Sequence, residues 1–154
     1  MCISFDIDNT LITTLPETDA DAGVLPRVLQ QRFIWPLRFG TRKLMRELQQ
    51  HGHRIWVYTS SGRGTLQIRL WLLFHGVLID GVVNERLHRK ELSDHRFDRL
   101  PSKYPPAFGI DLHVDDSEGV RMEADEYGFR VIVIAPNDKQ WTDKVLAAVN
   151  KLAN

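Results

Sequence analysis

The first twelve residues indicate both the class of fold and a candidate functional site. They are Met1-Cys2-Ile3-Ser4-Phe5-Asp6-Ile7-Asp8-Asn9-Thr10-Leu11-Ile12. The apolar run from Ile3 to Phe5 predicts a buried strand that ends in two aspartates and a threonine. Because side chains alternate along an extended chain, Asp6 and Asp8 point the same way. Two like charges so close are costly unless a cation neutralises them or one keeps its proton. The pattern indicates a metal-bound nucleophile beside a proton donor, and the alternative is a strand end with two solvated aspartates.

The composition is that of one globular domain. The chain has 154 residues, of which 43% are hydrophobic and 26% charged, so it can bury a core and is not disordered. Lys+Arg 20 balances Asp+Glu 20, which argues against general binding to nucleic acid or membrane surfaces. No secretory signal or membrane-spanning run is evident, and Cys2 is the only cysteine. We therefore expect a cytoplasmic protein without an internal disulfide and without membrane partners.

Short apolar runs alternate with amphipathic stretches, as in an α/β fold with a buried parallel sheet. Further strands are expected at 55–58, within 77–83, from 113 and at 130–135. Helices are expected between Thr41, as a cap, and Gly52, between 64 and 76, at about 117–127 and at 141–152. Residues 84–106 predict a short helix and a loop. In the second helix, the residues expected to face the core are Leu66, Leu70, Leu73 and Phe74.

Residues 12–40 interrupt this alternation. An acidic loop with Glu17, Asp19 and Asp21 comes first, and an apolar stretch broken by Pro26 and Pro36 follows. We interpret the segment as a small flap inserted after the first strand of a single domain that spans residues 1–154.

Four sets of polar residues follow the expected strands. In an open parallel sheet, ligands bind beyond the carboxyl ends of the strands. The sets are Asp6/Asp8/Thr10, Thr59-Ser60-Ser61-Gly62, Lys103 and Asp115-Asp116. The hydroxyl and glycine set suits the binding of a phosphate oxygen. Taken alone, each set also has an ordinary explanation: residues 59–62 as a turn, Lys103 as a solvated side chain and Asp115-Asp116 as a helix cap. Their occurrence in this order at strand ends favours one shared site.

In this order the four sets resemble the motifs of the haloacid dehalogenase (HAD) superfamily of aspartate-dependent phosphohydrolases. The family's Asp-x-Asp-x-Thr motif matches Asp6-Ile7-Asp8-Asn9-Thr10 in full. Its hydroxyl motif matches Thr59 with Ser60 as a rival, its lysine matches Lys103, and its acidic pair matches Asp115-Asp116. The resemblance spans about residues 1–136 and implies a Rossmann-like three-layer α/β/α sandwich with a small cap. Phosphorylation receiver domains use similar residues in another order, which excludes them.

The resemblance implies a magnesium-dependent phosphatase. Asp6 would attack phosphorus to form an aspartyl-phosphate, and Asp8 would protonate the leaving group. Thr59, Ser60 and Lys103 would hold the phosphoryl group. The implied Mg²⁺ ligands are Asp6, Asp8, Asp115 and Asp116, and the sequence leaves open which of the last two binds directly. The alternative is a non-catalytic regulatory protein that keeps the fold and binds metal or phosphate.

The substrate and the oligomeric state stay open. A small flap suits either a bulky substrate such as a phosphoprotein or a small phosphometabolite whose site is completed by a second subunit of a homo-oligomer. Residues 36–41 and 57–60 are loosely similar to protein phosphatases of the superfamily, but Asn9 stands where those have an acidic residue. Arg63 could reach the substrate but is interpreted as an exposed loop arginine. His88, His95 and His113 are interpreted as surface or hydrogen-bonded core residues.

Overall fold

The computed structural model describes residues 1–12 and 35–153, so most of the flap predicted over 12–40 lies outside the described residues. The described residues contain a sheet with strands β1 (Cys2–Phe5), β2 (Arg54–Tyr58), β3 (Gly81–Val83), β4 (Leu112–Asp115) and β5 (Val131–Val133). The strand order is β3-β2-β1-β4-β5, and every neighbouring pair is parallel. The predicted α/β fold with a parallel sheet is confirmed.

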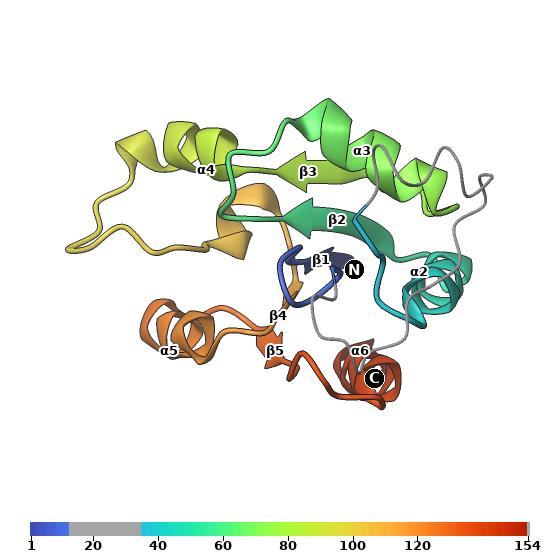
Figure 1. Ribbon diagram of the computed structural model, residues 1–154. Helices are drawn as coiled ribbons and strands as arrows, with labels where there is room; N and C mark the ends of the chain where they lie inside the picture. The colour runs from blue at the N-terminus through green and yellow to red at the C-terminus, as the bar shows by residue number, and fades with distance from the viewer. Residues whose placement is uncertain (13–34, 154) are drawn as a thin grey trace.

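Helices cover both faces of this sheet. They are α2 (Thr41–Gln50), α3 (Thr65–Phe74), α4 (Glu85–Glu91), α5 (Glu118–Tyr127) and α6 (Trp141–Ala153), with short 3-10 turns η1 (Leu92–Asp94) and η2 (Pro105–Phe108). Figure 1 shows α2 beside α6 on one face and α5 on the other. Right-handed crossovers place α3 with α2, and α4 with α5. The result is the three-layer α/β/α arrangement. None of the helices in the described ranges is long and apolar enough to cross a bilayer.

The apolar core forms one cluster on each side of the sheet. On the larger side, Ile3 and Phe5 of β1 pack with side chains of α2, α3 and α6. On the other side, Cys2, Tyr58 and Val83 form a smaller cluster with residues of α4 and η2. Burial on both faces explains why the strands read as continuous apolar runs.

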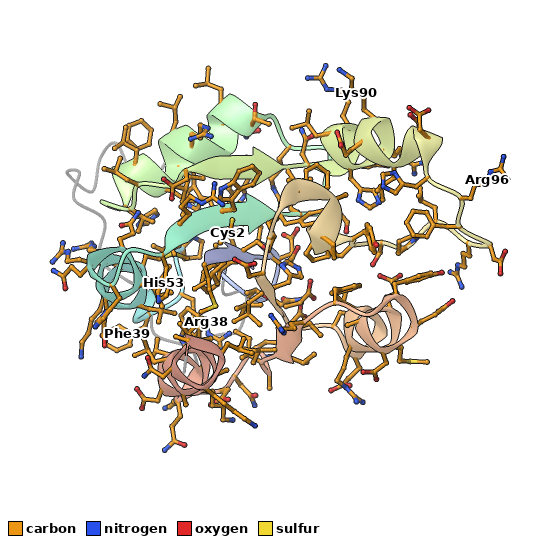
Figure 2. The ribbon with its side chains drawn as sticks, turned by 180° about the vertical axis from the view of Figure 1, so that it is seen from behind. Cys2, Arg38, Phe39, His53, Lys90 and Arg96 are labelled. Carbon is orange, nitrogen blue, oxygen red and sulfur yellow. The ribbon has the colours of Figure 1, made fainter. Side chains whose placement is uncertain are left out.

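The chain that returns at residue 35 is anchored against α6. Leu37 forms an antiparallel bridge with Ile12, and the Arg38 N–H donates to the Leu11 carbonyl at 2.7 Å. Arg38 is buried between α2 and α6, where Nη2 donates to the carbonyls of Ala135 and Asp138 at 2.8 Å each (Figure 2). The two ends that flank the undescribed segment are therefore held together.

Three local predictions differ from the structure. Thr41 begins α2 instead of capping it, and Gly40 occupies the cap position with φ 87. The strand expected within 77–83 is limited to Gly81–Val83. The predicted core face of α3 is wrong, because Leu66, Leu70 and Leu73 are exposed while Ile68, Trp71 and Leu72 are buried. This helix is apolar almost all round, so its periodicity does not select a face.

Candidate active site

The carboxyl ends of β1, β2 and β4 meet at one edge of the sheet. Because β1 lies between β2 and β4, residues that follow β1 have neighbours from both strands. The chain leaves β1 and β4 toward opposite faces, which opens a crevice at this edge. A cavity of about 420 Å³ lies there. It is lined by Asp6, Asp8, Asn9, Thr59, Ser60, Ser61, Ser102, Lys103, Asp115, Asp116, Ser117 and Val120. The structure thus brings all the predicted site residues together, and their roles stay predictions.

Asp6 lies at the floor of this cavity. Its N–H donates to the Val114 carbonyl at 2.9 Å, which continues the pairing of β1 with β4 by one residue. The side chain is buried, and Oδ1 accepts a hydrogen bond from Lys103 Nζ at 2.5 Å. Burial raises the pKa of Asp6 to about 6, and the positive charge of Lys103 opposes that rise. Asp6 is therefore a poorly hydrated carboxylate with one strong cationic partner.

Lys103 is buried at the centre of the site and is the partner of three oxygen atoms. Besides Asp6, its Nζ donates to the Tyr58 carbonyl at 2.8 Å and to Asp115 Oδ2 at 3.4 Å. An ammonium group has three donors, so these contacts match its capacity. The loop that carries Lys103 is tied to α5, because the Ser102 N–H and hydroxyl both donate to the Glu123 carboxylate. The lysine is thus held by its backbone as well as by its side chain.

Asp115 ends β4 in a network of fixed donors. Its Oδ1 accepts the Ser117 N–H at 2.9 Å, and its Oδ2 lies 2.9 Å from His113 Nε2. His113 Nδ1 in turn lies 2.7 Å from Ser4 Oγ. Burial alone would raise the pKa of Asp115, but the hydrogen bond from His113 and the charge of Lys103 outweigh it and hold the pKa below its usual range. Asp115 is therefore ionised at neutral pH.

Ser4 and His113 also belong to the site, although neither was expected there from the sequence. Burial lowers the pKa of His113, which keeps the ring neutral. A neutral ring that donates from Nε2 to Asp115 accepts at Nδ1 from Ser4. The sequence does place His113 two residues before Asp115, and therefore on the same side of β4. Ser4 of β1 is the register partner of His113. Only the pairing of β1 with β4 shows that the two side chains meet.

Asp8 lies at the rim of the cavity and forms a bidentate ion pair with Arg63. Arg63 Nη1 donates to Asp8 Oδ2 at 2.6 Å, and Nη2 donates to Oδ1 at 2.8 Å. These bonds raise the pKa of Arg63. The interpretation of Arg63 as an exposed loop arginine is wrong, because its side chain is only 23% exposed and pairs with Asp8.

The hydroxyl residues follow β2. Thr59 is buried, and its Oγ1 accepts the Ser61 N–H and donates to Ser61 Oγ, both at 3.1 Å. Ser60 is exposed, and its Oγ is 3.5 Å from the Ser102 carbonyl. Both line the cavity, so the choice between Thr59 and Ser60 as the phosphate ligand stays open.

The carboxylate oxygens of this site are of the kind that Mg²⁺ binds, and Mg²⁺ needs only a few of them from the protein. Among residues 1–12 and 35–153, no group of three or more His, Cys, Asp or Glu side chains is placed to hold a metal. Mg²⁺, however, commonly takes one or two protein carboxylates and completes its shell with waters and a substrate phosphate. Asp6 and Asp115 both contact the Lys103 ammonium, so their carboxylates lie close to each other at this edge of the sheet. The Asp8 carboxylate is paired with Arg63, and the place of Asp8 among the Mg²⁺ ligands stays a prediction.

Asp116 is the second member of the acidic pair and is partly buried. Burial raises its pKa, and so does the adjacent charge of Asp115, while a hydrogen bond with Asn9 opposes the rise. Asp115 is thus the more buried and more strongly hydrogen-bonded of the two, and Asp116 is the one nearer solvent.

Comparisons with known proteins add only a distant likeness. No family model and no curated protein matches this chain. Among solved structures, it is similar to one described as a predicted HAD-like family hydrolase from Porphyromonas gingivalis. The two share 13% identity over 99% of this chain and 97% of the other, with a TM-score of 0.49. A likeness this distant is no evidence of function. Any inference of function rests on the residues that line the cavity.

Proposed function

We propose that this protein is a magnesium-dependent phosphatase of the HAD type that hydrolyses phosphomonoesters through an aspartyl-phosphate on Asp6. One observation carries the proposal: the buried Asp6 carboxylate lies 2.5 Å from the Lys103 ammonium, at the floor of an open cavity that Asp8 also lines. The residues that we propose as nucleophile and as acid–base group thus line one cavity, together with a cation.

Asp6 suits the role of nucleophile. Its carboxylate has lost most of its hydration, and Lys103 favours its ionised form. In the first step a carboxylate oxygen forms a bond to phosphorus while the bond between phosphorus and the leaving oxygen breaks. In the second step water cleaves the acyl phosphate and restores the carboxylate.

Asp8 suits the role of acid and base. Its side chain is 52% exposed at the rim, where a leaving group enters and departs. It would give a proton to the leaving oxygen and then take one from the attacking water. The burial of Asp6 and the exposure of Asp8 give the two carboxylates the different environments that such a division of roles requires.

The remaining lining residues suit the binding of a phosphoryl group. Thr59, Ser60 and Lys103 supply hydroxyl and ammonium donors on one side of the cavity. Bound Mg²⁺, held by Asp6, Asp115 and the Asp8 carbonyl with Asp116 nearby, would neutralise phosphoryl charge. Both a phosphoprotein and a small phosphometabolite belong to the proposal as substrates.

Hydrolysis of an aryl phosphate with and without Mg²⁺ tests this function. The wild-type protein should turn over only with Mg²⁺, and Asp6→Asn should lose at least about 10³-fold in kcat. Asp125→Asn, an exposed aspartate on α5, is the matched control and should keep full activity. A pure wild-type protein that binds Mg²⁺ but turns over neither aryl phosphate nor a panel of phosphopeptides and phosphometabolites would contradict the proposal and favour a regulatory role.

A further inference from the structure

Arg63 and Asp8 form a fork-to-fork contact at the rim of the cavity. Both terminal nitrogens of the guanidinium group donate, one to each carboxylate oxygen, at 2.6 and 2.8 Å. Two parallel bonds fix the rotation of a carboxylate as well as its position, which a single bond does not do. Since half of the Asp8 side chain is exposed, water alone would leave it free to adopt several rotamers.

Trp35 supports the guanidinium group from another side. Arg63 Cζ lies 4.7 Å from the centre of the Trp35 ring, within the range of a cation–π contact. Trp35 is itself fixed, because its carbonyl accepts the Trp71 Nε1–H at 2.9 Å and its ring packs edge-on against Trp71 with centroids 5.8 Å apart. The Trp35–Trp71 pair therefore links α3 to the position of Arg63.

The backbone of Arg63 is also held. Asn84 Nδ2 donates to the Arg63 carbonyl at 2.9 Å, while Asn84 Oδ1 caps α4 by accepting the Leu87 N–H at 3.0 Å. The adjacent Glu85 N–H donates to the Ser61 carbonyl at 3.2 Å. The loop between β2 and α3 is thus pinned to the start of α4, so Arg63 is placed before any ligand arrives.

We propose that Arg63 is a positioning residue for the reaction and acts through Asp8. It holds the Asp8 carboxylate in one orientation at the rim, facing the leaving group and the attacking water. Each carboxylate oxygen keeps a second lone pair, so the two bonds to Arg63 leave Asp8 able to exchange a proton. This role rests on the proposed function, in which Asp8 is the acid and base.

A double-mutant cycle on aryl phosphate hydrolysis tests the role. Arg63→Ala should lower kcat by about 10- to 100-fold with KM nearly unchanged, since misplacing a catalytic group by about 1 Å can cost about 10²-fold. Arg63→Lys should recover little, because one ammonium group cannot make the fork. In an Asp8→Asn background, Arg63→Ala should have no further effect. Arg121→Ala, which breaks the exposed pair with Glu118, is the control.

Two kinetic results would overturn the proposal. A rise in KM with kcat unchanged would make Arg63 a substrate-binding residue. An equal loss in the wild-type and Asp8→Asn backgrounds would show that Arg63 acts independently of Asp8.

A measurement without turnover separates this proposal from the proposed function. In ¹⁵N spectra of the arginine side chains, the Arg63 guanidinium group should rotate slowly in the wild-type protein and in Arg121→Ala, and faster in Asp8→Asn. Equal rotation in all three proteins would overturn the positioning role whatever the activity. A held guanidinium group in a protein without any hydrolysis would overturn the proposed function instead, and the catalytic part of this proposal with it.

Discussion

The ammonium nitrogen of Lys103 lies 2.5 Å from Oδ1 of Asp6, although the two residues are 97 positions apart in the chain. The contact joins the end of β1 to the loop that precedes β4. Both side chains are buried, and burying opposite charges is costly unless their hydrogen bonds are satisfied. Here the Lys103 ammonium donates to two carboxylates and a carbonyl, so all three of its donors have a hydrogen-bond partner.

Lys103→Met should both abolish hydrolysis and destabilise the fold. Removing the cation leaves Asp6 and Asp115 facing each other without compensation, and breaking a buried ion pair costs about 3–5 kcal/mol. Urea unfolding gives the stability, and the aryl phosphate assay gives kcat. Lys90→Met is the matched control, because Lys90 projects outward from α4 (Figure 2). Unchanged stability in Lys103→Met would show that the carboxylates do not depend on this lysine.

Gly81→Ala should destabilise the sheet through a single methyl group. Gly81 is paired in register with Trp56, and an added Cβ would lie 2.2 Å from the Trp56 ring. Overpacking of this kind typically costs about 1–3 kcal/mol, which a shift in the urea midpoint measures. Trp56→Leu should remove most of the penalty in the double variant. Gly62→Ala, where the methyl meets nothing within 4 Å, is the control. An unshifted midpoint in Gly81→Ala would contradict the observed packing.

His88 should contribute a loss of stability as the pH drops below neutrality. This ring lies between the Tyr58 hydroxyl and the Pro101 carbonyl, 2.9 Å from the latter, and burial lowers its pKa from 6.5. The unfolded chain therefore takes up the proton at a higher pH than the folded protein does. The stabilisation is present above pH 6.5 and is lost as the pH falls, by up to about 1.4 kcal/mol per pH unit.

The measurement is the free energy of unfolding in urea at several pH values from about 7.5 down to 5.5. His88→Gln should show a shallower decline than the wild-type protein. His51→Gln, which removes an exposed histidine, controls for the number of histidines. Identical slopes in wild type and His88→Gln would refute the assignment to His88.

Sequence patterns predicted the sheet because its strands are buried on both faces. Ile3, Phe5, Val57 and Val114 are all inaccessible, and such strands appear as continuous apolar runs. The same reasoning failed for α3, where apolar residues occur on nearly every side of the helix. Leu66 and Leu70 were expected in the core and lie at the surface, whereas Ile68, Trp71 and Leu72 are the residues of this helix that pack in the core.

The candidate site could be predicted in part, for a related reason. Residues that end parallel strands must gather at one edge, so the order of Asp6, Thr59 and Asp115 along the chain was sufficient to expect them together. The Arg63–Asp8 pair and the Ser4–His113–Asp115 chain depend on rotamers and strand register. Local spacing places only His113 and Asp115 on one side of a strand, so the Arg63–Asp8 pair and the Ser4–His113 contact appear only in the assembled fold.

Transfer of a phosphoryl group to Asp6 can be detected by trapping the phosphoenzyme. Asp8→Asn should slow the second step, so that a phosphoenzyme accumulates during incubation with an aryl phosphate and Mg²⁺. Borohydride reduces an acyl phosphate to an alcohol, and peptide mass spectrometry locates the reduced residue. We predict homoserine at position 6 and none when Asp6→Asn is added to the variant. Hydrolysis by the wild-type protein with no reduced residue at position 6, or with phosphate on Ser60 or Thr59, would contradict it.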